Sequence, residues 1–190
     1  MQLKLFQVFR SGTFKAMHGQ QLSFSDGDLQ SMAAAFNPQT RPAPLVPGHP
    51  RDDQPAMGQV TKLVFYESKL YALAMVGEAL VGMVRAKSFK GVSASFFPPF
   101  SDENPTPGAY YLKHVGFLSD MQPAVKGMES PAFAEHSDGL CFAEAYAVPS
   151  TQLQRMGLSD RAVLDQLAVQ FCEACPEMSY VKAVQLAMAV

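Results

Sequence analysis

The chain has 190 residues, 48% of them hydrophobic, and a formal net charge of -2 at pH 7. This composition supports one ordinary hydrophobic core and argues against intrinsic disorder, and the nearly neutral charge argues against a nucleic-acid partner. The first residues lack the apolar core of a signal peptide, and no stretch reaches the roughly 20 apolar residues of a membrane span. We therefore expect a cytoplasmic protein that binds neither membranes nor nucleic acid.

The first third of the chain combines one strand, one helix and a long loop. Residues 2–10 alternate loosely between apolar and polar side chains, which predicts a strand. Ser25 is a good N-cap, and apolar residues then recur at helical spacing, so a helix is expected over 25–36. Residues 38–55 are rich in proline, which predicts a loop around a short apolar strand at 45–46.

The middle of the chain has the pattern of an α+β protein. Residues 59–76 read as two strands joined by a tight polar turn at 67–68, which predicts a β-hairpin. A short helix is expected within 77–87 because apolar residues recur there among good helix formers. Strands are expected over 91–97 and 109–118, which are rich in β-branched and aromatic residues.

The C-terminal part has a different composition. Residues 152–190 are rich in Leu, Ala, Met and Gln with helical periodicity. We therefore divide the chain into a domain at 1–149 and a C-terminal helical segment at 150–190. An amphipathic segment of this kind can bury its apolar stripe against a second copy, so a homo-oligomer is expected.

The three cysteines do not suggest a disulfide framework, and their odd number suits a reducing compartment. Cys172 and Cys175 have the spacing of redox and zinc motifs, but no second such pair exists in the sequence. We favour two structural cysteines near one face of a helix and expect neither a metal nor a cofactor.

Three separate segments carry side chains suited to nucleophilic catalysis. His49 lies between prolines just after the short strand, although a lone histidine in such a turn more often only satisfies a carbonyl. Strand alternation places Ser93 and Ser95 on one face, and no Gly-x-Ser-x-Gly elbow is present. His114 lies in the next strand, where a buried core histidine is the usual case. Together a loop histidine, a strand serine and a strand histidine supply a nucleophile, a base and an orienting group if the strands adjoin.

Three segments occur in the same order as in one phage protein family: PLVPGHP at 44–50, FKGVSASF at 89–96 and YLKHVGFL at 111–118. On these segments the chain resembles the prohead proteases and protease-scaffold proteins of Mu-like and related tailed phages. The likeness extends to about Met128 and therefore covers most of the chain.

The resemblance implies a fold and a set of roles. These phage enzymes are similar to assemblin, the herpesvirus maturation protease, which implies an antiparallel β-barrel flanked by helices, followed here by the C-terminal helical segment. It also implies that Ser93 is the nucleophile, His49 the base and His114 the third member of the site. His18 is a rival for the third role, because some phage relatives place an acidic residue in that region. Ser95 is the alternative nucleophile.

The activity implied by the resemblance is that of a serine endopeptidase. It would cleave scaffold and capsid proteins, and itself, inside the assembling prohead in the host bacterial cytoplasm. Its partners would be the phage major capsid protein and the scaffold protein, with 150–190 as a linker towards a scaffold region. A neutral histidine as the orienting group predicts a slow enzyme with an optimum near or above neutral pH.

Two other functions remain as alternatives. One is a non-catalytic capsid assembly scaffold with the same fold, in which Ser93 is merely structural. The other is a metal-dependent hydrolase that uses His18, His49 and His114, although these histidines lack the paired spacing of usual zinc ligands.

Overall fold

The structure is a computed structural model and describes residues 1–15, 19–119, 123–131, 133 and 158–189. The chain forms two compact units, Met1–Phe133 and Ala134–Val190. The domain boundary predicted after residue 149 lies outside the described residues.

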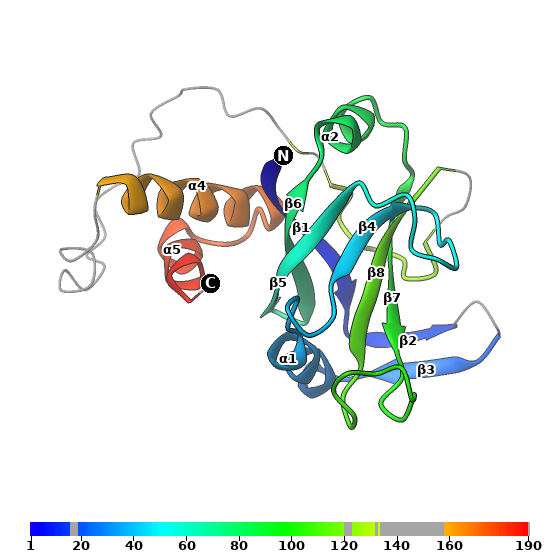
Figure 1. Cartoon of the computed structure of the whole chain (residues 1–190). Coiled ribbons are helices and arrows are strands. Elements are labelled where there is room, and N and C mark those ends of the chain that lie inside the picture. The colour runs from blue at the N-terminus through cyan, green and yellow to red at the C-terminus, as the bar shows by residue number, and fades with distance from the viewer. Residues whose placement is uncertain (16–18, 120–122, 132, 134–157, 190) are drawn as a thin grey trace. The chain divides into compact units, whose positions relative to one another are not determined.

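A curled six-stranded sheet forms the framework of the first unit (Figure 1). In spatial order its strands are β1 (Gln2–Arg10), β6 (Lys69–Val76), β5 (Gly58–Tyr66), β4 (Ala43–Pro47), β8 (Tyr111–Leu118) and β7 (Gly91–Phe97). The outer strands β1 and β7 contact each other, and the rings of Phe9 and Phe96 meet there with centroids 5.0 Å apart. The sheet is thus bent towards a barrel.

The predicted antiparallel barrel is wrong in one respect, because the sheet is mixed. Strands β4 and β8 run parallel, with Leu45 paired to Val115, while the other neighbouring strands run antiparallel. Periodicity identifies a strand but does not specify its neighbour, so the parallel pairing was not predicted. This pairing brings the end of β4, with the loop that follows it, beside the strand that carries His114.

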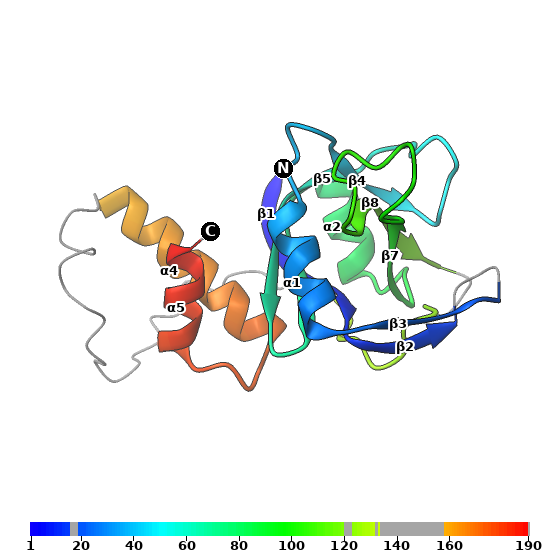
Figure 2. The same ribbon diagram turned by 90° about the horizontal axis from the view of Figure 1, so that it is seen from below.

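The helices of the first unit match the predicted positions. Helix α1 (Asp26–Ala35) begins at Ser25, whose hydroxyl accepts from the Asp28 backbone N–H while the Asp28 carboxylate accepts from the Ser25 backbone N–H. It contacts β5, β6 and β8 (Figure 1, Figure 2). Helix α2 (Glu78–Arg85) buries Leu80 and Val81.

A second small sheet was not predicted. It pairs β2 (Gly12–Lys15) with β3 (Gln21–Phe24), and each strand has only 4 residues. Alternation over so few residues is too short to be distinguished from a loop. The ring of Phe24 packs edge-on against Phe9, which joins this ribbon to the main core.

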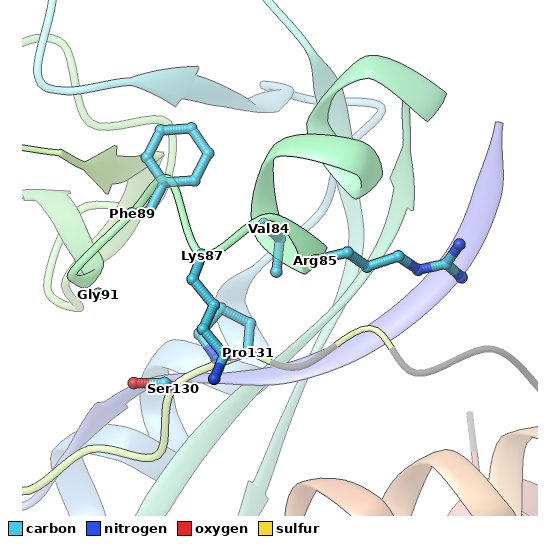
Figure 3. Close-up of a pocket in the computed structure, with 7 residues that line it drawn as sticks. All are labelled: Val84, Arg85, Lys87, Phe89, Gly91, Ser130 and Pro131. Atoms are coloured by element: carbon cyan, nitrogen blue, oxygen red, sulfur yellow. The ribbon is translucent and has the colours of Figure 1, made fainter.

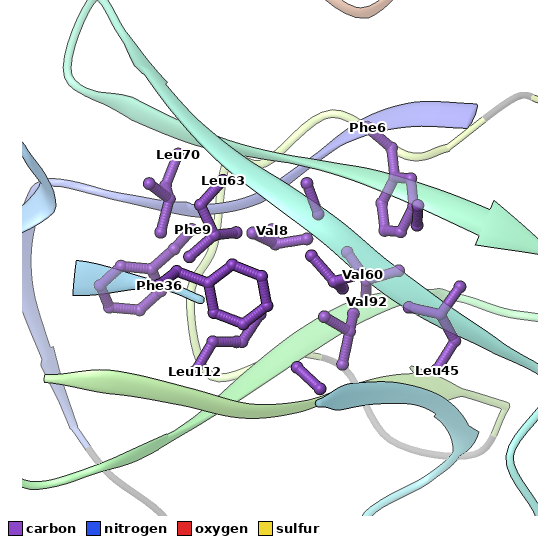
Figure 4. Close-up of a cluster of buried hydrophobic side chains, with 14 of the residues drawn as sticks. Phe6, Val8, Phe9, Phe36, Leu45, Val60, Leu63, Leu70, Val92 and Leu112 are labelled. Atoms are coloured by element: carbon purple, nitrogen blue, oxygen red, sulfur yellow. The ribbon is translucent and has the colours of Figure 1, made fainter. Parts of the chain in front are cut away.

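The core lies inside the curve of the sheet and draws side chains from almost every strand. Figure 4 shows part of this cluster, including Phe6, Val8, Phe9, Phe36, Leu45, Val60, Leu63, Leu70, Val92 and Leu112. Burial of so many apolar side chains from distant segments stabilises the sheet that positions the site described below.

The second unit contains α4 (Leu158–Ala174) and α5 (Tyr180–Met188), which contact each other. Leu167, Phe171 and Val184 are among its buried side chains. The helical character predicted for this part of the chain is confirmed in the residues that the structure describes. No described helix is both long enough and apolar enough to cross a membrane.

Candidate active site

The β7–β8 pair brings the predicted serines next to His114. Ser93 is paired with Gly116, and Ser95 with His114. Residues directly opposite each other in an antiparallel pair project to the same face, so Ser93, Ser95 and His114 share the face that points away from the core. Val92 projects into the core, as the predicted alternation requires. Ser93 itself is only partly buried.

A β-bulge determines the direction of the His114 side chain. The partner of Ser95 is His114, but the partner of Phe96 is Leu112, so Lys113 is the extra residue in β8. Strict alternation would place Leu112 and His114 on one face. With the bulge, Leu112 enters the core while His114 points to the face that carries the serines.

The loop after β4 places His49 above Gly116. The Gly48 N–H donates to the Phe117 carbonyl over 2.8 Å, and Gly48 turns the chain with φ of +66°. A Cβ added to Gly116 would lie 3.0 Å from Cε1 of His49. The imidazole therefore lies over Gly116, and Ser93 lies directly opposite Gly116 on the neighbouring strand.

No hydrogen bond joins Ser93 to His49 in the described part of the chain. Catalytic hydrogen bonds are often long in unliganded enzymes and shorten when substrate is bound. The placement of both residues around Gly116 is the geometric relationship that the structure supplies.

His49, His114 and Asp53 form a continuous chain of hydrogen bonds. Nδ1 of His49 lies 2.7 Å from Nε2 of His114, and Nδ1 of His114 lies 2.6 Å from Oδ1 of Asp53. An ionised carboxylate only accepts, so Nδ1 of His114 carries the donated proton. In the neutral ring Nε2 then accepts from Nδ1–H of His49. This order leaves Nε2 of His49 with a free lone pair, as a general base requires.

The surroundings favour neutral imidazoles. Burial lowers the pKa of His49, and the nearby His114 lowers it further. Burial also lowers the pKa of His114, while the hydrogen bond and charge of Asp53 raise it and the Lys113 ammonium lowers it. Because the net shift is downward for both rings, His49 is ready to accept a proton at neutral pH.

Asp53 was not predicted from the sequence. It lies in the loop 48–57 with φ of 57°, a left-handed conformation that Asp tolerates better than most residues. Its neighbour Asp52 instead accepts from the backbone N–H of Gln54 over 3.3 Å. The available signal was an acidic pair three and four residues after His49, but only the folded loop shows which carboxylate faces the histidines.

The remaining sequence candidates are placed less favourably. Ser95 lies opposite His114, whose two ring nitrogens are already engaged by His49 and Asp53. His18 lies outside the described residues, so its rivalry with His114 for the third role stays untested.

The described segments contain no candidate metal site. No group of three or more His, Cys, Asp or Glu side chains there is arranged to hold a metal ion. Cys172 and Cys175 are free thiols, and burial raises the pKa of Cys172, which disfavours a reactive thiolate.

A pocket of about 390 Å³ opens near the start of β7 (Figure 3). It is lined by Val84, Arg85, Lys87, Phe89, Gly91, Ser130 and Pro131. The lining contains neither Ser93 nor Ser95 nor the hydrogen-bonded histidines, so this pocket is separate from the candidate active site.

Comparisons with known proteins give structural matches only. No protein-family model matches the sequence, and comparison with curated proteins gives no match. One similar solved structure is the protease of Kaposi's sarcoma-associated herpesvirus in complex with a dimer disruptor, at 14% identity and a TM-score of 0.40, covering 64% of this chain and 71% of that chain. Another, of the same viral protease with an allosteric inhibitor, has 14% identity and a TM-score of 0.43 and covers 94% of both chains. Similarity at this level assigns no function.

Proposed function

We propose that this chain is a serine endopeptidase in which Ser93 is the nucleophile, His49 the general base and His114 the orienting group. The observation that carries the proposal is the hydrogen bond of 2.7 Å between the two histidines. It fixes the His49 ring over Gly116, opposite Ser93, with its Nε2 free.

The proposed reaction follows from this arrangement. Nε2 of His49 removes the hydroxyl proton of Ser93 as the serine oxygen attacks a peptide carbonyl. The same nitrogen then returns the proton to the leaving amine, and the peptide bond breaks to give an acyl-enzyme. A water molecule, activated by His49 in the same way, hydrolyses the ester and restores Ser93.

His114 would act by holding His49. By accepting from Nδ1–H of His49, it fixes the tautomer whose other nitrogen is basic and stabilises the imidazolium that forms during the reaction. Since His114 is only 3% exposed, its ring is held by packing as well as by hydrogen bonds.

The biological role that we propose is maturation of a phage prohead, with scaffold protein and major capsid protein as substrates. Its support is the likeness of the segments 44–50, 89–96 and 111–118 to tailed-phage prohead proteases. In the structure these three segments contribute His49, Ser93 and His114 to one face of the sheet. The second unit would link the protease to a scaffold region and support self-association.

A non-catalytic assembly scaffold remains a second candidate. The observation in its favour is that Ser93 and His49 are not hydrogen-bonded in the described structure. In this case the two histidines and Asp53 would serve only to anchor the loop 48–57 to β8.

The first experiment is intact-mass analysis after treatment with a fluorophosphonate, on the wild type and on Ser93→Ala. An activated serine is labelled rapidly, whereas an ordinary serine is not. We expect one added label on the folded wild type, none on Ser93→Ala, and none on wild type that is denatured before treatment. Failure of the folded wild type to react would favour the scaffold role.

A further inference from the structure

The loop between β4 and β5 contributes two side chains to the hydrogen-bonded chain, one on each side of His114. His49 binds Nε2 of the ring and Asp53 binds Nδ1, at 2.7 and 2.6 Å. The loop is also tied to the sheet at both ends, through Gly48 N–H to the Phe117 carbonyl and Met57 N–H to the Leu45 carbonyl, each at 2.8 Å.

We propose that Asp53 is a positioning residue that fixes the proton on Nδ1 of His114 and supplies the negative charge on which the two histidines depend. This inference rests on the proposed protease function and adds a fourth member to its site. Ser93, His49, His114 and Asp53 then act in series, with a carboxylate at the end furthest from the nucleophile.

The proton arrangement supports this role. Without a carboxylate, Nδ1–H and Nε2–H tautomers of His114 would differ little in energy, because each nitrogen could serve as donor or acceptor to a neutral partner. The ionised Asp53 accepts only, which selects Nδ1–H on His114. That selection leaves the lone pair on Nε2, so His49 must donate from its own Nδ1 and keep Nε2 basic.

The charge of Asp53 is directed at His114 more than at the nearby lysine. Its Oδ1 lies 2.6 Å from Nδ1 of His114 but 3.8 Å from Nζ of Lys113. The Asp53 side chain is 21% exposed, so water screens its interaction less than at the open surface. When His49 takes the serine proton, this carboxylate stabilises the positive charge shared by the two rings.

The charged and titratable groups that face this pair come from three elements. The loop 48–57 supplies Asp53, β8 supplies Lys113 and His114 itself, and β7 supplies the neutral hydroxyls of Ser93 and Ser95. Among the described residues, loss of the carboxylate would leave the Lys113 ammonium as the charge acting on His114. The histidine pair would then be harder to protonate, and a neutralising change at Asp53 would move its titration to lower pH.

The test compares Asp53→Asn with Asp52→Asn. Asparagine preserves the shape of the side chain and tolerates positive φ, so Asp53→Asn removes the charge with little strain on the loop. Asp52→Asn makes the same charge change one residue away, on an exposed side chain that does not contact the histidines. Thermal unfolding and circular dichroism on both variants establish that each is folded.

Two readouts are measured. The first is the rate at which Ser93 is labelled by the fluorophosphonate as a function of pH. We expect Asp53→Asn to lower the maximal labelling rate by about 10- to 100-fold. Neutralising a carboxylate that is hydrogen-bonded directly to the general base costs more, roughly 10⁴-fold. We also expect its acid limb to move to lower pH, while Asp52→Asn keeps the wild-type profile.

The second readout is the ¹⁵N chemical shift of the histidine side chains, which reports tautomer and protonation without requiring activity. We expect Nδ1–H on His114 in the wild type and a mixed or altered tautomer with a lower titration midpoint in Asp53→Asn. Unchanged shifts and an unchanged midpoint would overturn the inference. If the wild type is not labelled, the proposed function fails, and the NMR result still decides whether Asp53 holds His114.

Discussion

The imidazole of His49 occupies the space that a side chain on Gly116 would need. A Cβ at this position would lie 3.0 Å from Cε1 of His49 and 2.1 Å from the carbonyl oxygen of Gly48. The second distance is far inside van der Waals contact, and its partner is backbone that cannot rotate away. Gly116 is thus required by the loop that carries the proposed base.

Replacement of Gly116 with alanine should therefore damage both the site and the fold. The added methyl group pushes the loop and His49 away from Ser93, and a displacement of about 1 Å can cost about 10²-fold in rate. We expect Gly116→Ala to slow labelling of Ser93 by at least about 10-fold and to destabilise the fold by about 1–3 kcal/mol, as overpacking does. Fluorophosphonate labelling and urea unfolding measure the two effects.

Gly82→Ala is the matched control, because a Cβ at Gly82 in α2 has no atom within 4 Å to meet. Alanine in a helix is favoured over glycine, so this variant should be equally or more stable, by up to about 1 kcal/mol, with an unchanged labelling rate. If Gly116→Ala were labelled at the wild-type rate, the position of His49 would not limit the reaction.

Ser95→Ala should leave the reaction intact. Ser95 lies opposite His114, both of whose ring nitrogens are hydrogen-bonded to other side chains, so no free base faces it. Ser93 lies opposite Gly116, beneath the ring whose Nε2 is free. We expect Ser95→Ala to be labelled at a rate within about threefold of the wild-type rate. The change removes a hydroxyl opposite His114 and leaves Ser93 and His49 unaltered. Peptide mapping that places the label on Ser95 in the wild type would reverse the two assignments.

The labelling rate should rise with pH below the ordinary titration range of histidine. His49 must be neutral to accept the serine proton, and burial lowers its pKa from the ordinary value of about 6.5. The fraction in the active, neutral form therefore increases with pH through a midpoint below 6.5. Labelling rates measured from about pH 4.5 to about pH 8, in steps of about half a pH unit, would locate this midpoint. A midpoint at or above 6.5 would show that His49 is more exposed or more strongly paired to a negative charge than in the structure.

Local patterns were sufficient to predict most elements of the first unit. The strands at 2–10 and 91–97 and the hairpin turn at 67–68 appear as expected, because apolar alternation and turn residues are properties of adjacent positions. The parallel pairing of β4 with β8 joins residues about 70 positions apart and depends on strand order, which periodicity does not encode.

The site shows the same division between local and long-range information. Ser93, His49 and His114 were identified from segments that resemble a known family, and the structure brings the two histidines into contact. Asp53 was missed because its contact depends on how the loop folds back onto β8. The bulge at Lys113 was also missed, because it changes the face of His114 without any change in composition.

Tyr111 offers a test of stability at some distance along β8 from the proposed catalytic group. Its side chain is fully buried, and its hydroxyl lies 2.6 and 2.8 Å from the carbonyl oxygens of Asn37 and Arg41. Tyr111→Phe keeps the ring contact with Phe36 but leaves these carbonyls without the hydroxyl donor, at an expected cost of about 1–3 kcal/mol in the free energy of unfolding.

The matched control for Tyr111→Phe is Tyr110→Phe. Tyr110 precedes β8 and is partly exposed, and the substitution keeps its ring contact with Phe24. This control should change the unfolding free energy by less than about 0.5 kcal/mol, as surface substitutions usually do. The hydroxyl of Tyr111 ties the turn after α1 to β8, and this turn leads into β4 and the loop of His49. We therefore expect urea unfolding to separate the two variants while both keep the wild-type labelling rate at 25 °C, since about 1–3 kcal/mol leaves a typical domain folded. Equal stability of the two variants would mean that water replaces the Tyr111 hydroxyl and that the turn is held by its other contacts.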